Sequence, residues 1–287
     1  MGKVLLAGAT GYLGGYILSE LLKRQYEVTV VVRSPSKLDP VEAEKIEVIQ
    51  AQVTEPESIR DCCADIDFVI STVGITSQKD GLKYMDVDYQ ANKNLLAEAL
   101  NSGVKKFIYI SVFKGKELRD LKVCQAKERF VDELKQSGIN YCVIRPNGFF
   151  SDMEEVYKMA EKGRIYLFGD GEYKLNPIHG EDLAAVCGDA IEETKKEIEV
   201  GGPETLSHNE IASIAFAAAG KEKKINYLPE SLAKIALFLL RTFTSQKFYG
   251  PLEFFLTVLT RDMVAPEAGE HTLREFYANI KEKSREA

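Results

Sequence analysis

Three glycines near the start of the chain have the spacing of a phosphate-binding turn. Gly8, Gly11 and Gly14 follow a short apolar run at 4–7 and precede apolar residues at helical spacing. They therefore connect a strand to a helix, where backbone N–H groups and the positive end of the helix dipole can approach a pyrophosphate. The turn predicts a dinucleotide site that takes in Gly8, Thr10, Gly11, Tyr12, Leu13 and Gly14.

Each glycine of this turn has its own task. Gly8 allows the sharp exit from the strand, and Gly11 leaves no Cβ between the backbone and a phosphate. Gly14 lets the helix lie close to the sheet. Because any tight turn favours glycine, the elements around the turn must supply the rest of the evidence.

The residues after the second apolar run, 28–32, indicate which nucleotide the site takes. An NAD site has a carboxylate here for the ribose 2′-hydroxyl, whereas this chain has Arg33. A guanidinium can form paired hydrogen bonds with a 2′-phosphate, and Ser34 and Lys37 can assist it. We therefore expect NADP as the cofactor. The alternative is that Arg33 and Lys37 only solvate a surface loop.

The composition is that of an ordinary globular protein. The 287 residues carry a formal net charge of −7, and the isoelectric point is near 5.3. An acidic chain lacks the basic face that phosphate contacts require, so we expect no nucleic-acid partner. The first strand begins almost at the N-terminus, and we therefore expect no signal or transit peptide and a cytoplasmic location.

Neither the cysteines nor the histidines have the spacing of a disulfide framework or a metal site. The five cysteines show no C-x-x-C motif, and we interpret them as reduced thiols. The histidines, His179, His208 and His271, are far apart in the sequence and lack a partner at ligand spacing, so we expect no metal. His179 is interpreted as a structural residue.

Strand and helix patterns alternate along the first part of the chain. Apolar runs predict strands at 28–32, 46–49, 68–71, 106–110 and 141–144, with helices at 88–101 and 127–136. Thr54 and Glu57 predict a capping box for a short helix. This order predicts an α/β fold, a Rossmann-type doubly wound parallel sheet with a smaller, mostly helical C-terminal substrate lobe.

The expected division of the chain follows from this order. We expect the NADP-binding Rossmann domain at 1–146 plus about 180–200, and the substrate lobe at 147–179 and 201–287. Ligands of such sheets bind beyond the carboxyl ends of the strands. The residues expected there are Thr72, Val73, Gly74, Ser111 and Pro146.

Several segments together resemble the short-chain dehydrogenase/reductase superfamily, in its extended and atypical branches. They are GATGYLG, VDYQANKNLL, FIYISV, AKERFVDELKQSGINYCVIRP, FGDGEYKLNPIHGEDLA and GGPETLSHNEIA, and they span about residues 3–220. Within that superfamily the chain is most similar to the NmrA-like NAD(P)H-binding group, with its isoflavone-reductase-like and divinyl-chlorophyllide-reductase-like enzymes. The resemblance implies a Rossmann sheet with a C-terminal substrate lobe and leaves the substrate open.

The chain departs from the superfamily at the usual catalytic tyrosine. The resemblance implies a serine and a Tyr-x-x-x-Lys motif. Ser111 and Lys127 match, but Val123 occupies the tyrosine position and cannot donate a proton. We interpret Lys127 either as the proton donor, with a pKa lowered by burial, or only as an anchor for the cofactor ribose. Ser111 would orient a substrate oxygen or the nicotinamide.

A second departure concerns the adenine contact. Gln52 and Val53 stand where the superfamily often has an acidic residue that accepts from the adenine amino group. The amide oxygen of Gln52 can still accept such a hydrogen bond. Asp88 is expected to cap its helix or face solvent, and Asn92 and Asn94 to lie on the helix surface or form buried hydrogen bonds.

The C-terminal third contains two unusually apolar stretches, 232–240 and 252–259. Each is too short to span a bilayer, which needs about 20 apolar residues. One interpretation is a pair of helices packed on the core of the lobe. The other is an apolar lid for a lipophilic substrate or a membrane-surface contact, lined by Phe238, Phe243, Phe248, Phe254 and Phe255.

Together these features predict an NADP(H)-dependent oxidoreductase, a reductase of an apolar small molecule. The glycine turn would hold the pyrophosphate, and the C-terminal lobe would close over the substrate. The alternative is a non-catalytic NADP(H)-binding sensor or assembly factor of the NmrA-like type, which Val123 favours. Substrate identity, reaction direction and oligomeric state are left open.

Overall fold

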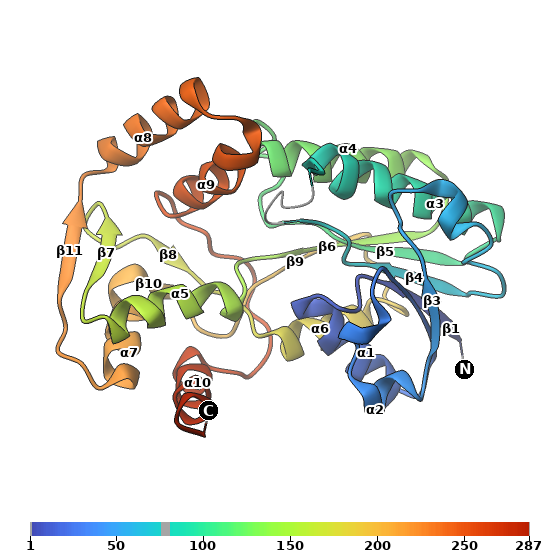
Figure 1. Cartoon of the computed structure of the whole chain (residues 1–287), viewed down its shortest axis with the longest axis horizontal. Helices are drawn as coiled ribbons and strands as arrows, with labels where there is room; N and C mark the ends of the chain where they lie inside the picture. Colours follow the sequence, from blue (N-terminus) through green and yellow to red (C-terminus); the bar gives the residue numbers. More distant parts are fainter. Residues whose placement is uncertain (1, 76–80, 287) are drawn as a thin grey trace. The chain divides into compact units, whose positions relative to one another are not determined.

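The computed structural model describes residues 2–75 and 81–286, and the chain forms two compact units (Figure 1). Unit 1 comprises Met1–Arg145 and Leu183–Ile198. Unit 2 comprises Pro146–Asp182 and Glu199–Ala287. The second unit is therefore formed by two separate stretches of the chain.

A seven-stranded sheet forms the centre of unit 1. Its order is β3-β2-β1-β4-β5-β6-β9, and the pairings from β3 to β6 are all parallel. The strands are β1 (Lys3–Ala7), β2 (Glu27–Val32), β3 (Glu47–Gln50), β4 (Phe68–Ser71), β5 (Lys106–Ile110), β6 (Tyr141–Pro146) and β9 (Glu197–Val200). Because the strand order reverses between β1 and β4, the carboxyl ends of these two strands mark the ligand-binding position of a doubly wound sheet. The predicted Rossmann-type fold is confirmed.

Helices cover both faces of this sheet. Figure 1 shows α1 (Tyr12–Lys23) and α6 (Gly180–Asp189) on one face, and α3 (Asn92–Asn101) and α4 (Lys122–Gln136) on the other. Short helical segments lie between strands: η1 (Pro35–Lys37), α2 (Pro40–Ala43), η2 (Pro56–Ile59) and the π-helical η3 (Met85–Ala91). Side chains from the sheet and α4 interdigitate in the core, where the rings of Tyr109 and Phe130 meet edge to face at 4.6 Å.

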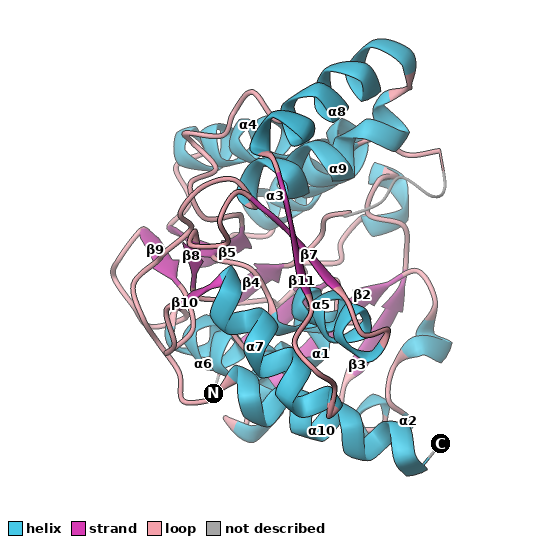
Figure 2. Cartoon of the chain, turned by 90° about the vertical axis from the view of Figure 1, so that its left-hand side faces the viewer, coloured by secondary structure: helices cyan, strands magenta, loops and turns pink. Residues whose placement is uncertain are grey.

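Unit 2 combines helices with two small sheets. The helices are α5 (Phe150–Glu161), α7 (His208–Ala219), α8 (Glu230–Phe243), α9 (Gln246–Val258) and α10 (Leu273–Glu286). Strand β7 (Ile165–Phe168) pairs with β11 (Ile225–Leu228), as Figure 2 shows, and β8 (Lys174–Leu175) pairs with β10 (Leu206–Ser207). Its core contains Phe150, Tyr157, Phe216, Leu273 and Tyr277. Within the described residues, no helix is both long and apolar enough to cross a bilayer.

Two local predictions need correction. The helix expected at 88–101 begins earlier, as the π-helical η3, and becomes α-helical at Asn92. The capping box expected at Thr54 and Glu57 is wrong, because η2 is a single 3₁₀ turn whose N-cap residue, Glu55, makes no side-chain capping bond. Proline at the first position of η2 leaves one N–H fewer to satisfy.

Candidate functional site

The glycine turn joins β1 to α1 and is held by Thr72, the residue that follows β4. Gly8 has a φ of +95°, and a Cβ there would lie 2.3 Å from Thr72 Oγ1. The Thr72 amide donates to the Ala7 carbonyl at 3.0 Å, and its hydroxyl lies 3.2 Å from the same oxygen. Thr72, which the sequence places among the cofactor contacts, thus also fixes the shape of the turn.

Gly14 allows α1 to start directly above the turn. A Cβ on Gly14 would lie 2.0 Å from the Gly8 carbonyl oxygen, so no side chain fits. The N-cap of α1 is Gly11, which forms no side-chain cap, and the first turn of α1 contains no acidic residue. The positive end of α1 is therefore not neutralised by its own side chains, as an anion site requires. Thr10, Gly11 and Tyr12 are exposed around it, and Leu13 is buried.

The basic segment after β2 is a short exposed turn. Arg33 follows the last residue of β2, and Ser34 is the N-cap of η1. Lys37 ends η1, and the side chains of Arg33 and Lys37 are exposed. The three residues predicted to select the nucleotide thus lie on one turn at the carboxyl end of a strand next to β1.

The loop after β3 is held by hydrogen bonds from two other segments. The backbone N–H of Gln52 donates to Ser58 Oγ at 2.9 Å, and Asn94 Nδ2 donates to the Val53 carbonyl at 3.0 Å. Gln52 and Val53 are half-buried. Asn94 is therefore not on the helix surface: its side chain is buried and forms this hydrogen bond.

Asp88 and Lys127 form a buried pair that the sequence does not reveal. The expectation that Asp88 caps a helix or faces solvent is wrong: Asp88 is 0% exposed, and its Oδ1 lies 3.1 Å from Lys127 Nζ. Its other oxygen accepts from the Ile75 amide at 3.3 Å. A Cβ on Gly74 would lie 2.7 Å from Asp88 Oδ1 and 3.0 Å from Lys127 Nζ, so the absent side chain leaves this pair open.

The charge state of Lys127 differs from the one expected. Burial opposes the charge on Lys127, but Tyr109 and Asp88 outweigh burial and raise the pKa of Lys127 above its usual value. Burial raises the pKa of Asp88, and the ammonium opposes that rise. This direction contradicts the expected lowering of the Lys127 pKa and favours the protonated form of Lys127 at neutral pH.

Two further residues belong to this site: Tyr109, which the sequence analysis did not single out, and Asn92, which forms the buried hydrogen bonds expected as one of its two alternatives. Tyr109 is fully buried, its hydroxyl donates to the Asp88 carbonyl at 3.4 Å, and its ring centroid lies 5.5 Å from Lys127 Nζ. Asn92 Nδ2 donates to the carbonyls of Val73 and Asp88 at 3.0 Å each. The strand alternation that places Tyr109 on the same face as Ser111 is the only signal that pointed to the tyrosine.

The Ser111 side chain forms a hydrogen bond with α4, inside the fold. It is buried, and its hydroxyl donates to Glu128 Oε1 at 3.0 Å. Glu128 Oε2 accepts from Arg145 Nη2 at 3.0 Å, so the hydroxyl belongs to a buried ion pair. The structure thus assigns Ser111 a contact within the fold. Val123, at the usual tyrosine position, is half-buried and packs on the core of unit 1, and Pro146, the last residue of β6, is buried.

Unit 2 brings two distant histidines together. The rings of His179 and His271 stack with centroids 4.4 Å apart, and His271 Nδ1 lies 2.8 Å from Asp182 Oδ1. Ligand atoms of His179, Glu181 and His271 all lie within 4.8 Å of one another. The separation of these histidines in the sequence therefore does not predict their separation in the structure.

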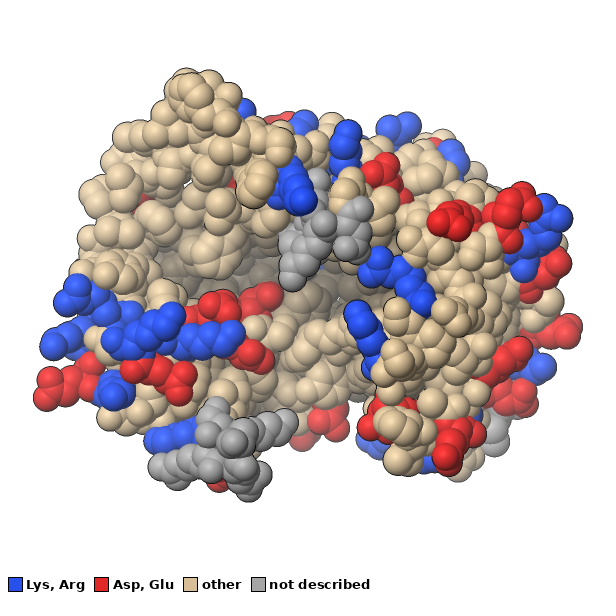
Figure 3. All heavy atoms as spheres, viewed as in Figure 1, with Lys and Arg blue, Asp and Glu red and all other residues tan. Residues whose placement is uncertain are grey.

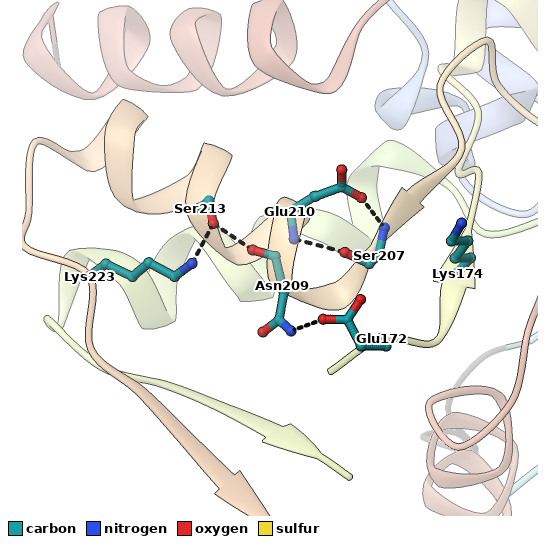
Figure 4. Close-up of a pocket in the computed structure, with 7 residues that line it drawn as sticks. All are labelled: Glu172, Lys174, Ser207, Asn209, Glu210, Ser213 and Lys223. Atoms are coloured by element: carbon teal, nitrogen blue, oxygen red, sulfur yellow. Dashed lines mark hydrogen bonds between the residues drawn. The ribbon is translucent and has the colours of Figure 1, made fainter. Parts of the chain in front are cut away.

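A polar pocket of about 340 Å³ in unit 2 is lined by side chains that form hydrogen bonds with one another (Figure 4). Asn209 Nδ2 donates to Glu172 Oε1 at 2.7 Å, and Lys223 Nζ donates to Ser213 Oγ at 2.9 Å. Ser207 and Glu210 form the capping box of α7.

Known proteins resemble this chain over most of its length. Residues 8–194 match a family described as NAD(P)H-binding. The divinyl chlorophyllide a 8-vinyl-reductase of Cucumis sativus is 27% identical, with 97% of this chain and 76% of the relative covered. The photosystem II assembly factor Ycf39 of Trieres chinensis is 27% identical, with 81% and 74% covered.

A solved structure agrees in fold. An NADPH-dependent quinone oxidoreductase of Escherichia coli superposes with a TM-score of 0.74 at 19% identity, with 96% of this chain and 99% of that chain covered. At this identity the agreement concerns the fold alone. The family match covers the glycine turn, the loop after β4 and the Asp88–Lys127 pair. The chain therefore belongs to the NAD(P)H-binding family.

Proposed function

We propose that this protein is an NADP(H)-dependent reductase of an apolar, conjugated small molecule. The observation that carries the proposal is the buried ion pair of Lys127 and Asp88 beside Gly74, just beyond the strands at which a doubly wound sheet binds its ligand. Two relatives support the substrate class, since one is named for reducing a vinyl group of a chlorophyllide and the solved structure for reducing quinones.

The residues present fit a bound dinucleotide. Gly14 lets α1 start against the Gly8 carbonyl, and the uncapped start of α1 offers N–H groups to a pyrophosphate. Arg33, with Ser34 and Lys37, would hold the 2′-phosphate, and this supports NADP as the preferred form. The loop that contains Gln52 would face the adenine.

The chemistry of the proposal needs no proton from the protein. When bound, NADPH supplies a hydride to one atom of a conjugated double bond or quinone. The Lys127 ammonium, paired with the Asp88 carboxylate, would stabilise the negative charge that develops on the conjugated system. Solvent then supplies the proton. This scheme is compatible with a valine at position 123. A reduction in which a tyrosine at that position donates the proton is not compatible with valine.

NADPH oxidation in the presence of quinones, enones and vinyl-substituted macrocycles tests the proposal. Lys127→Met should lower kcat by at least about 100-fold at saturating NADPH, since it removes a charge-stabilising donor. Lys93→Met is the matched control, because Lys93 lies on α3 and pairs at the surface with Glu133. Unchanged turnover in Lys127→Met would contradict the role of the ammonium.

A second candidate function is a non-catalytic NADP(H)-binding assembly factor. Val123 and the inward contact of Ser111 with Glu128 favour it, because neither of the usual acid-base groups faces a substrate. The relative named as a photosystem II assembly factor supports the same class. NADPH binding without turnover against the whole panel would favour this function over the reductase.

A further inference from the structure

The helices α8 and α9 present most of the large apolar side chains that unit 2 exposes. Of the fourteen such side chains in the part of the chain that the structure describes, eight lie between Leu232 and Phe255. Phe243, Phe238 and Phe248 are 77%, 68% and 65% exposed. Figure 3 shows the surface over α8 as an almost continuous uncharged area. Exposed apolar patches of this extent mark interaction sites.

The exposed residues follow the helical repeat. On α8, Leu232, Ile235, Leu239 and Phe243 lie at spacings of three and four and thus share one face. On α9, one face likewise presents Phe248, Leu252 and Phe255, which are spaced by four and three residues.

A different face holds the two helices together. Ala233 of α8 is buried, and Gly250 and Glu253 of α9 are buried. The exposed apolar faces are therefore not needed to close the hairpin, which Figure 2 shows as two adjacent helices. They are available to something outside unit 2.

The charges of the hairpin are complementary to an anionic partner. Lys234, Arg241 and Lys247 are exposed. The hairpin contains two acidic residues, and both are engaged: Glu230 accepts from the Tyr173 hydroxyl at 2.8 Å, and Glu253, which is 2% exposed, accepts from Arg241 Nε at 2.8 Å. The hairpin surface is thus cationic on a chain whose formal net charge is −7.

We propose that the α8–α9 hairpin docks on the surface of an anionic lipid bilayer. Phenylalanine and leucine would enter the boundary of the acyl chains, while lysine and arginine would meet the headgroups, as in interfacial amphipathic helices. The helices contain 14 and 13 residues, too few to span, so the contact is with the surface. A second copy of the chain fits less well, because it would bring two cationic hairpins together.

Vesicle flotation with the full chain tests this proposal. We expect binding to vesicles of phosphatidylcholine with phosphatidylglycerol, weaker binding in high salt, and little binding to phosphatidylcholine alone. The double variant Phe238→Ser with Phe243→Ser should bind at least about tenfold more weakly, since each side chain contributes buried apolar area. Tyr166→Ser with Tyr227→Ser, exposed residues of β7 and β11, is the matched control.

Three results would overturn the proposal. They are a full chain that does not float with anionic vesicles, a Phe238/Phe243 variant that floats as well as the wild type, and a concentration-dependent dimer that the same variant abolishes. Thermal unfolding of the variant should match that of the wild type, because both side chains are exposed. NADPH affinity should also be unchanged, so this test is independent of the proposed reductase activity.

Discussion

A carboxylate and an ammonium are both costly to bury, and Asp88 and Lys127 reduce that cost by facing each other. Their Oδ1 and Nζ atoms are 3.1 Å apart in the interior of unit 1. Gly74 lies directly against the pair, and a side chain at this position would collide with both charged groups. A charge maintained in this way is suited to stabilising charge on a ligand, and less suited to giving up a proton.

Replacing Asp88 by asparagine should change the titration of Lys127. The carboxylate raises the pKa of Lys127 and burial opposes this, so the pKa of Lys127 falls in Asp88→Asn. Activity that depends on the ammonium is lost as the pH rises through this pKa. We therefore expect the alkaline limb of the pH–activity profile, which lies above the ordinary lysine range in the wild type, to move down toward that range in Asp88→Asn.

The matched variant for this experiment is Asp86→Asn. Asp86 lies on the same π-helical segment, but its carboxylate accepts from the Lys83 amide. It should leave the alkaline limb in place. A profile that shifts equally in both variants would assign the effect to η3 and not to the charge beside Lys127.

At the scale of elements, the glycine turn depends on close approach between backbones. The start of α1 lies against the Gly8 carbonyl, and Thr72 ties the turn to β4. These contacts determine where the N–H groups of α1 point. A small displacement of α1 would therefore affect both stability and anion binding.

Gly14→Ala and Gly15→Ala form a matched pair for this element. A Cβ on Gly14 would lie 2.0 Å from the Gly8 carbonyl oxygen, whereas the nearest atom to a Cβ on Gly15 is 4.0 Å away. Gly14→Ala should lose about 2 kcal/mol of stability and bind NADPH more weakly. Gly15→Ala should retain both properties. Equal NADPH affinity of the two variants, measured by titration, would contradict the assigned role of Gly14.

The strands of unit 1 could be predicted because each is a short apolar run between polar turns. Those at 68–71 and 106–110 were predicted with the bounds that the structure has, and β2 and β3 within one residue. The π-helical start of the helix at Met85 could not be predicted, because the apolar patterns of π and α segments are similar over one turn. The capping box at Thr54 failed because proline at position 56 starts the helix later.

The candidate site was predictable only in its local parts. The glycines and Arg33 are recognisable from neighbours in the sequence, and their roles toward a nucleotide stay predictions. The pairing of Asp88 with Lys127 and the contact of Ser111 with Glu128 join separate elements. The residue pattern of a single element does not show which residue of another element it will contact. In the sequence, an acidic residue on a helix looks the same whether its side chain is buried or exposed.

At the scale of the whole molecule, one ion network ties distant parts of the chain together. Arg145 of β6 pairs with Glu128 of α4 and, through Nε at 3.0 Å, with Glu197 of β9. Lys135 and Lys116 also contact Glu197. Burial disfavours the Glu197 carboxylate, but these cations outweigh burial and lower the pKa of Glu197 to about 2.

This network predicts how stability depends on pH. A depressed carboxyl pKa adds stability above the usual value near 4.5, and that stability is lost as the pH falls toward about 2. Glu197→Gln should therefore be less stable than the wild type by about 2 kcal/mol at pH 7, with a smaller difference near pH 3. Thermal unfolding at both pH values checks this. Glu155→Gln, an exposed surface pair with Lys158, should show no such pH dependence.

The most direct test of the account is calorimetric titration of the full chain with NADPH and NADH. We expect one saturable site, tighter for NADPH, and a loss of that preference in Arg33→Ala, because the proposal pairs this guanidinium with the 2′-phosphate. Arg60→Ala, an exposed arginine that pairs with Glu57, should keep the preference. Saturable binding of NADPH would support the site at the glycine turn, and no saturation with either nucleotide would contradict it.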